Sequence, residues 1–125
     1  MLGVDVKFDD DDVYERLVLL GPDGWDRAEF GVIELDAELV CTGYSTTEAD
    51  FAGLDKERVI GKEFFARVGV CMNNFLVSSR YEEGQLDEVI PYTLTVMMEP
   101  TPVRLRMLAP AGDGPRYLLV DRTID

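Results

Sequence analysis

Hydrophobic positions change their spacing about 30 residues into the chain. Before that point, Val13, Leu17 and Leu20 recur at helical spacing behind a run of four aspartates, which suit the start of a helix. The run lacks the spaced acids, central glycine and closing glutamate of an EF-hand loop. The segment "GPDGWD" then supplies the glycines and proline that end a helix. The pattern predicts an N-terminal helical cap, residues 1–28, ahead of a core domain, residues 29–125.

After the cap, short apolar runs are typical of strands. The runs "FGVIEL" and "LVCTGY", separated by "DAE", predict a β-hairpin. Short helices follow, one beginning at Asp55, one through Phe64 and Phe65, and one ending at Gly84. Three further strands are predicted over "VIPYTLTVMM", "PVRLRMLAP" and "PRYLLVDR". This order favours an α+β fold, with a central antiparallel five-stranded sheet that carries short helices on one face.

One predicted strand has a clear period of two. Val103, Leu105 and Met107 alternate with Arg104 and Arg106. This alternation is the signature of a strand with one buried and one exposed face.

Charge and composition exclude several classes of function. The chain of 125 residues has 25 acidic and 12 basic residues, giving a net charge of −13. Nucleic acid and anionic membranes would be repelled, so neither is an expected partner. No apolar run reaches the roughly 20 residues of a membrane span, and no signal peptide is evident, which indicates a cytoplasmic protein. Strong acidity favours a monomer or at most a weak dimer.

The chain contains no histidine and only two cysteines, Cys41 and Cys71. Nucleophile–histidine pairs, imidazole bases and histidine metal ligands are therefore excluded, and two thiolates cannot complete a zinc site. Cys41 lies in a predicted strand and is assigned to the core. An enzyme using Cys71 as nucleophile would lack a base, so the sequence favours a protein that is not an enzyme.

Several segments together resemble the photoactive yellow protein family, whose members are blue-light photoreceptors with a PAS fold. They are "FGVIELD", "GYSTTEADFAG", "VIGKEFFARVGVC", "PYTLTVMMEPTPV" and "AGDG". One register without gaps joins Phe30 through Tyr44 and Glu48 to Cys71. The resemblance covers most of the chain after Phe30 and includes the cap.

The resemblance implies a bound chromophore, 4-hydroxycinnamic acid (p-coumaric acid), held as a thioester on Cys71. Tyr44 and Glu48 fall where the family hydrogen-bonds the phenolate of this group, and Phe64 falls where an aromatic side chain packs beside the ring. Other positions of the pocket or its lid are Ala52, Leu54, Val68, Gly69, Val70, Tyr92, Leu94 and Met98. Light would isomerise the chromophore from trans to cis.

The residue chemistry agrees with these roles. A buried carboxyl without a cationic partner tends to stay protonated, so Glu48 could donate a hydrogen bond to a phenolate and pass its proton to it after isomerisation. The carboxylate left behind would be costly to bury, which would loosen the N-terminal cap and signal to an unknown downstream protein.

Three positions depart from the family pattern. Ala52 stands where a threonine is usual, Leu54 where an arginine shields the pocket, and Val70 where a proline often precedes the cysteine. About four residues are also missing between Gly84 and Tyr92. The sequence therefore predicts an anionic chromophore that is less securely held than in close family members.

Each residue also has a reading without a chromophore. Cys71 could be an inert core thiol, Tyr44 could end a strand with its hydroxyl in water, and Glu48 could be a solvated helix residue. The alternative function is a chromophore-free PAS domain that dimerises or binds a small apolar ligand.

Overall fold

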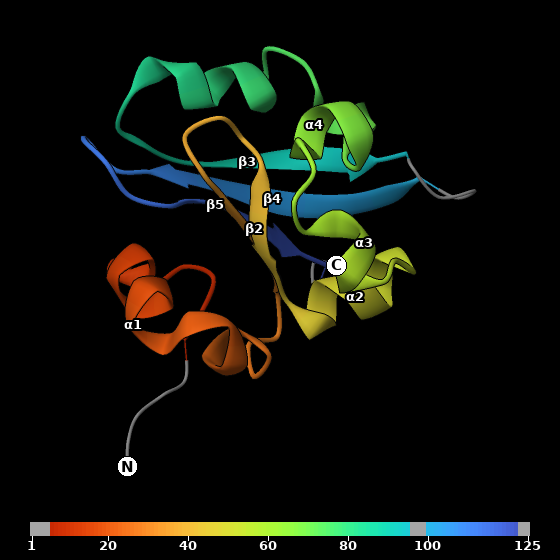
Figure 1. Cartoon of the computed structure of the whole chain (residues 1–125), viewed down its shortest axis with the longest axis horizontal. Coiled ribbons are helices and arrows are strands. Elements are labelled where there is room, and N and C mark those ends of the chain that lie inside the picture. Colours follow the sequence, from red (N-terminus) through yellow and green to blue (C-terminus); the bar gives the residue numbers. More distant parts are fainter. Residues whose placement is uncertain (1–5, 96–99, 123–125) are drawn as a thin grey trace.

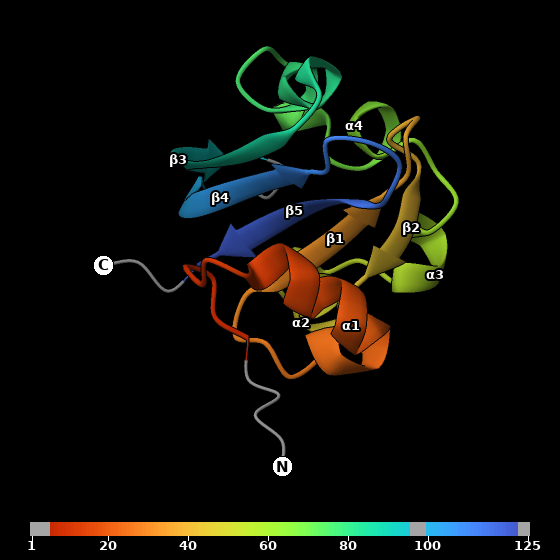
Figure 2. The same ribbon diagram turned by 90° about the vertical axis from the view of Figure 1, so that its left-hand side faces the viewer.

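The computed structural model describes residues 6–95 and 100–122, and its centre is one antiparallel sheet. The strands lie side by side in the order β2-β1-β5-β4-β3 (Figure 2). Their bounds are β1 Gly31–Leu35, β2 Cys41–Tyr44, β3 Leu86–Leu94, β4 Thr101–Ala109 and β5 Arg116–Asp121. The first and last strands of the core thus pair in the middle of the sheet, where Gly31 lies opposite Val120. The predicted five-stranded antiparallel arrangement is confirmed.

Helices cover the two faces of the sheet unequally. The short elements lie on one face, and the long N-terminal helix lies on the other (Figures 1 and 2). The elements are α1 Val13–Trp25, α2 Thr46–Ala52, α3 Lys56–Val59, α4 Phe64–Arg67 and the 3₁₀ turns Val70–Met72 and Ser78–Glu83. No helix among the described residues is long and apolar enough to cross a bilayer.

Side chains immediately before the short helices explain where these helices begin. Ser45 accepts a hydrogen bond from the amide of Glu48, Asp55 from that of Glu57, and Glu63 from that of Phe65. Each cap satisfies a backbone donor that the helix leaves unpaired. A chain of short helices can therefore form where none has the length to be stable alone.

The N-terminal helix ends less simply than its sequence predicts. Gly21 takes a left-handed backbone with φ of 68°, which interrupts the helix, and one further turn runs through Pro22 to Trp25. Asp12 stands at the N-cap position but makes no capping bond, and its carboxylate instead accepts from Nε of Arg16 at 3.0 Å.

Two hydrophobic clusters lie on opposite faces of the sheet. One fills the space under the short helices and includes Ile33, Tyr44, Phe64, Leu105 and Val120. The other lies under the cap, and its members are Val6, Phe8, Val13, Leu17, Trp25, Ala28, Phe30, Val32, Leu108, Tyr117 and Leu119. The cap therefore buries the face that would otherwise be exposed.

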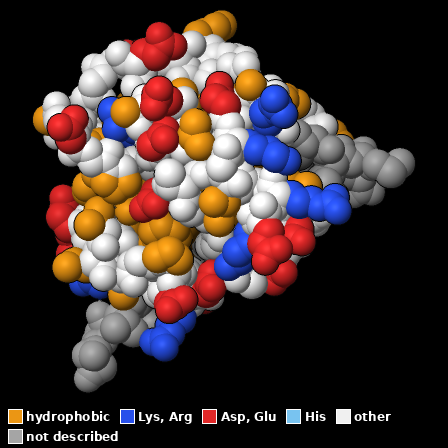
Figure 3. Space-filling model, viewed as in Figure 1, with side chains coloured by type: hydrophobic (Ala, Val, Ile, Leu, Met, Phe, Trp, Pro, Cys, Tyr) orange, Lys and Arg blue, Asp and Glu red, His pale blue; other side chains and the backbone are white. Residues whose placement is uncertain are grey.

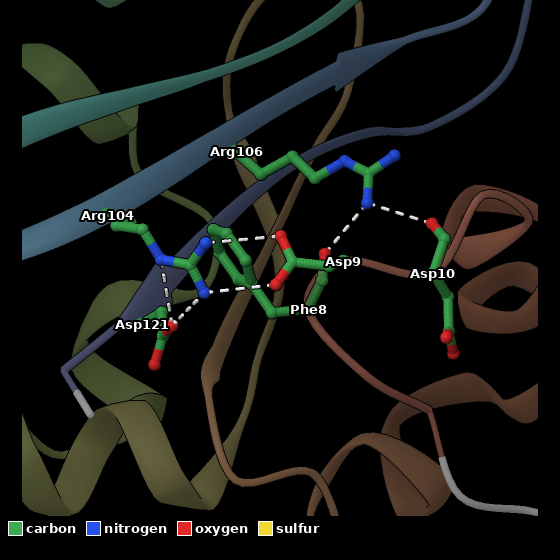
Figure 4. Close-up of polar contacts among 6 residues, drawn as sticks. All are labelled: Phe8, Asp9, Asp10, Arg104, Arg106 and Asp121. Atoms are coloured by element: carbon green, nitrogen blue, oxygen red, sulfur yellow. Dashed lines mark hydrogen bonds and ion pairs between the residues drawn. The ribbon is translucent and has the colours of Figure 1, made fainter. Parts of the chain in front are cut away.

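This second cluster overturns the prediction of an exposed face on β4. Arg106 is only 6% exposed, and its Nη1 donates to the backbone oxygens of Phe8 at 2.7 Å and Asp10 at 2.8 Å (Figure 4). Arg104 donates to the carboxylates of Asp9 and Asp121 and stacks on the Phe8 ring at 4.7 Å. The arginines alternate with apolar residues because they bind the cap, and not because they face water.

The predicted helix ending at Gly84 is shorter than expected. Only Ser78–Glu83 is helical, as a 3₁₀ turn, and Phe75 and Leu76 before it are exposed. Strand β3 begins at Leu86, three residues before the predicted start at Val89.

On the face seen in Figure 3, acidic and hydrophobic side chains are interspersed, and most basic side chains gather towards the right.

Candidate functional site

A small pocket lies between the sheet and the short helices, with a cavity of about 60 Å³. Eight of the predicted site residues line it, contributed by four different elements and the loops beside them. These are Tyr44, Glu48, Ala52, Leu54, Phe64, Val68, Gly69 and Leu94, and they are joined by Phe51, Met72, Thr101 and Arg122. The fold thus brings together residues up to 78 positions apart, from Tyr44 to Arg122.

The polar end of the pocket holds an ion pair. Nη1 of Arg122 donates to Oε1 of Glu48 at 2.6 Å, and Nη2 donates to Oε2 at 2.9 Å. The side chains of Arg122 and Glu48 are only 12% and 6% exposed. The guanidinium also lies 5.0 Å from the ring centre of Phe51. The sequence-based expectation that Glu48 has no cationic partner is therefore wrong.

Burial and the ion pair together determine the directions in which the pKa values of Glu48 and Tyr44 shift. Burial raises the pKa of Glu48 above its ordinary value, while the hydrogen bonds and charge of Arg122 limit that rise. Burial and the charge of Glu48 raise the pKa of Tyr44, so its hydroxyl keeps its proton. This hydroxyl makes no hydrogen bond to the described part of the chain, which leaves a donor available at the pocket.

Two neighbours on the sheet side hold Glu48 in place. Ser45 caps α2, and its Oγ accepts both from the amide of Glu48 at 3.2 Å and from the amide of Val32 at 3.0 Å. Gly31 lies directly under the carboxylate, and a Cβ there would come within 2.0 Å of Oε1. Only a residue without a side chain allows Glu48 to lie this close to β1.

Replacing Ser45 with alanine should destabilise the protein by about 1 to 2 kcal/mol, because α2 loses its cap and the Val32 amide loses its acceptor. Urea denaturation measures the change in the free energy of unfolding. Thr46→Ala, one residue along on the exposed side, is the matched control and should change it by less than about 0.5 kcal/mol. Equal effects of the two variants would contradict the role assigned to Ser45.

Arg122 was not found from the sequence, although a signal for it exists. Leu118 and Val120 of β5 face the cluster under the short helices. Side chains alternate along a strand, so the side chain two positions on faces the same way. Continuing this alternation past Val120 places Arg122 towards the helical face, whereas its neighbour Asp121 faces the cap and accepts from Arg104 at 2.7 Å.

Cys71 lies beside the pocket without lining it. The residue is half-buried in the 3₁₀ turn, between Gly69 and Met72, which both contribute to the wall. Its backbone oxygen accepts from the hydroxyl of Tyr92 at 2.6 Å, and that hydroxyl in turn accepts from Nδ2 of Asn74 at 2.8 Å. Tyr92, predicted near the pocket wall, therefore positions the backbone of Cys71.

The remaining predicted positions are less central. Val70 is 56% exposed and does not line the cavity. Leu54, 42% exposed, lies at the pocket mouth, where the sequence departs from the family pattern. Met98 lies outside the described residues. The other thiol, Cys41, is fully buried as predicted, and burial raises its pKa to about 11.

The lining of the pocket combines polar groups with an aromatic wall. Tyr44 and Glu48 offer polar contacts at one end, and Phe64 offers an aromatic wall. Gly69 leaves room for the Phe64 ring, because a Cβ at this position would lie only 2.5 Å from it. A cavity of about 60 Å³ holds only a few waters, and two of the side chains that line it, Phe51 and Leu54, are exposed.

Comparison with known proteins identifies the family. The chain is 30% identical over 121 residues to the photoactive yellow protein of Halochromatium salexigens, which covers 94% of this chain and 97% of that protein. The chain belongs to the photoactive yellow protein family. A photoactive yellow protein from Rhodothalassium salexigens is 29% identical over the same shares of both chains. No protein-family model matches the chain.

Solved structures agree with this assignment. The photoactive yellow protein domain of the sensor histidine kinase Ppr from Rhodospirillum centenum superposes with a TM-score of 0.77 at 28% identity, over 85% of this chain and 96% of that one. The PAS domain of an HTR-like protein from Haloarcula marismortui, at 17% identity and a TM-score of 0.59 over 91% of this chain and 99% of that one, supports the fold alone. The predicted PAS fold is confirmed, and members of the photoactive yellow protein family are typically photoreceptors without enzymatic activity.

Proposed function

We propose that this protein is a cytoplasmic blue-light photoreceptor that carries p-coumaric acid as a thioester on Cys71. The observation that carries the proposal is the meeting of Tyr44 and Glu48 in one pocket, beside the turn that holds this cysteine. When bound, the chromophore supplies visible-light absorption and trans-to-cis isomerisation. No enzymatic step is assigned to the pocket.

The residues of the chain would anchor and orient this group. Cys71 supplies the sulfur of the thioester, and the hydrogen bond from Tyr92 fixes the backbone around it. Tyr44 and Glu48 provide the hydrogen bonds to the ring oxygen, and Phe64 packs beside the ring. A phenolic oxygen buried without such partners would be costly, so these two groups favour one position of the ring in the dark.

The output of such a receptor is a change at the N-terminal cap, read by a downstream signalling protein. The cap is packed on the sheet through Phe8 and the arginines of β4, so its release must break the contacts of Arg104 and Arg106. Those contacts lie on the face of the sheet opposite the pocket. The signal would therefore have to pass through the sheet, from the pocket on one face to the cap on the other.

Formation of the adduct on Cys71 is the direct test. Incubation with an activated p-coumaroyl ester should add one p-coumaroyl group to the protein, as the cysteine sulfur displaces the leaving group. Mass spectrometry and the absorption spectrum measure the product. Cys71→Ala should lose the adduct completely. Cys41→Ala, the matched control, should keep it, because the Cys41 thiol is fully buried and its raised pKa keeps it protonated.

A second function is favoured by the small size of the cavity. About 60 Å³ with Leu54 at the mouth also suits a PAS domain that binds a small apolar ligand or dimerises without any chromophore. This alternative predicts an unmodified Cys71 after incubation with the activated ester. An adduct that forms equally well in Cys71→Ala would contradict the assignment of the site.

A further inference from the structure

Asn74, three residues after Cys71, makes hydrogen bonds that hold the backbone of this cysteine. Its Nδ2 donates to the hydroxyl of Tyr92 at 2.8 Å and to the backbone oxygen of Cys71 at 3.4 Å. The Tyr92 hydroxyl donates to the same backbone oxygen at 2.6 Å. One carbonyl group therefore accepts from two side chains, and the more distant donor, Asn74, also orients the closer one.

The other end of the Asn74 side chain is bonded to the segment that follows. Its Oδ1 accepts from the amides of Leu76 at 2.9 Å and Val77 at 3.2 Å. An asparagine that accepts from a backbone amide shortly after it in the chain closes a tight turn. The backbone oxygen of Asn74 accepts in addition from Oγ of Ser78 at 3.1 Å. Asn74 is thus held from the C-terminal side while its Nδ2 reaches back to the turn of Cys71.

The turn around Cys71 is short. It is a single 3₁₀ turn, Val70–Met72, and the residue before it, Gly69, offers no side-chain cap. Two backbone hydrogen bonds close it, to the oxygens of Gly69 at 2.9 Å and Val70 at 3.2 Å. Short 3₁₀ turns have poor hydrogen-bond geometry, and glycine loses more conformational freedom on folding than any other residue. The two side-chain donors on the Cys71 carbonyl therefore contribute much of the order of this turn.

We propose that Asn74 is a positioning residue for Cys71. By holding the Tyr92 hydroxyl against the Cys71 carbonyl, it fixes the peptide that follows this cysteine and so the placement of the sulfur beside the pocket. Asn74 does not line the pocket and acts through Tyr92 and the backbone. The inference rests on the proposed function where it concerns the chromophore, and its first part concerns the chain alone.

The first experiment uses the whole chain without chromophore and measures how fast iodoacetamide alkylates Cys71, whose thiolate displaces iodide. In Asn74→Ser the hydroxyl can still accept from the following amides, but it is too short to reach Tyr92. Cys71 should react about fivefold faster, which corresponds to the loss of one hydrogen bond of about 1 kcal/mol. Tyr92→Phe should give a similar increase. In the Tyr92→Phe background, Asn74→Ser should add less than about twofold, because its main route to the carbonyl is gone.

Two controls separate this role from a general effect on stability. Asn73→Ser changes the neighbouring residue, whose Oδ1 accepts from Oγ of Ser78, and should leave the Cys71 rate unchanged. Cys41 is fully buried, so its alkylation in the same sample, resolved by mass spectrometry of peptides, reports opening of the whole fold. Equal Cys71 rates in wild type and Asn74→Ser would overturn the inference. An equal acceleration of Cys41 and Cys71 would overturn it as well.

The second experiment uses the p-coumaroyl adduct and follows the visible band as the ring ionises. The pocket stabilises an anionic ring only while Cys71 holds the ring there, so the ring midpoint should rise by about 0.7 pH unit in Asn74→Ser, the same fivefold factor. The ionisable groups that line the pocket, Tyr44, Glu48 and Arg122, are the same in every variant.

Asn73→Ser is again the control and should keep the wild-type midpoint. A midpoint in Asn74→Ser equal to that of the wild type would contradict the link between Asn74 and the placement of the ring. Absence of any adduct in the wild type contradicts the proposed function, and the alkylation rates then decide the role of Asn74 by themselves.

Discussion

Replacing Arg106 with methionine is expected to lower the free energy of unfolding by about 3 kcal/mol. Methionine keeps much of the apolar stem but removes the donors to the backbone oxygens of Phe8 and Asp10, which the cap buries against the sheet. It also removes the pair with Asp87, but that carboxylate is half exposed, so most of the loss comes from the two oxygens left without a partner.

Urea denaturation measures this loss, and hydrogen exchange locates it. The amides of α1 should exchange faster in Arg106→Met than in the wild type, and those of the central strands should change less. Arg80→Met is the matched control, because Arg80 is more exposed than Arg106 and pairs with Glu88, so its loss should cost less than about 1 kcal/mol. If the two variants unfolded at the same urea concentration, the cap would not depend on Arg106.

Replacing Gly31 with alanine should cost about 3 kcal/mol or more, because the new methyl group displaces a buried ion pair. The methyl carbon would lie 2.0 Å from Oε1 of Glu48 and 3.0 Å from its Cβ, so a rotation of the carboxylate alone does not relieve the contact. The strand cannot retreat easily, since Gly31 is paired with Val120 of β5. Glu48 must leave Arg122, and each buried charge loses its partner.

A double-mutant cycle with Glu48→Ala separates this contact from a general strain on β1. In the Glu48→Ala background the same glycine substitution should cost less than about 1 kcal/mol, because the carboxyl atoms at 2.0 and 2.9 Å are gone and only the Cβ at 3.0 Å remains. Gly112→Ala is the control for the substitution itself, since a Cβ there meets nothing within 4 Å, and the expected change is below about 0.5 kcal/mol. An equal cost of Gly31→Ala in both backgrounds would contradict the proposed contact.

Local patterns were sufficient for the elements whose partners are near in sequence. The hairpin from Gly31 to Tyr44 follows from alternating apolar residues and a short polar turn, and the helix after Asp55 follows from its cap. The five-stranded antiparallel sheet also followed from the run of short apolar segments, but the order of its strands, with β1 beside β5, did not. The gathering of Tyr44, Glu48 and Phe64 in one pocket agrees with the register that the family resemblance gave them.

Contacts between distant segments explain what the sequence did not reveal. The period of two in β4 predicts that Arg104 and Arg106 face water. The backbone oxygens that Arg106 binds lie 96 and 98 residues away along the chain, so the strand's own pattern does not reveal them. Likewise, the charge state expected for Glu48 assumed no cation, and its partner lies 74 residues away. A pattern confined to one strand reports which side chains alternate, and it does not report what covers the polar face.

The end of β5 carries both of these long-range arrangements on consecutive residues. Asp121 accepts from Arg104, which also holds the cap, and Arg122 holds Glu48 on the other face of the sheet. A single peptide bond therefore separates the residue that senses the pocket from the residue that secures the N-terminal segment. A shift or rotation of the end of β5 would change both contacts together. A rearrangement of the pocket on one face of the sheet would then weaken the attachment of the N-terminal segment on the other face.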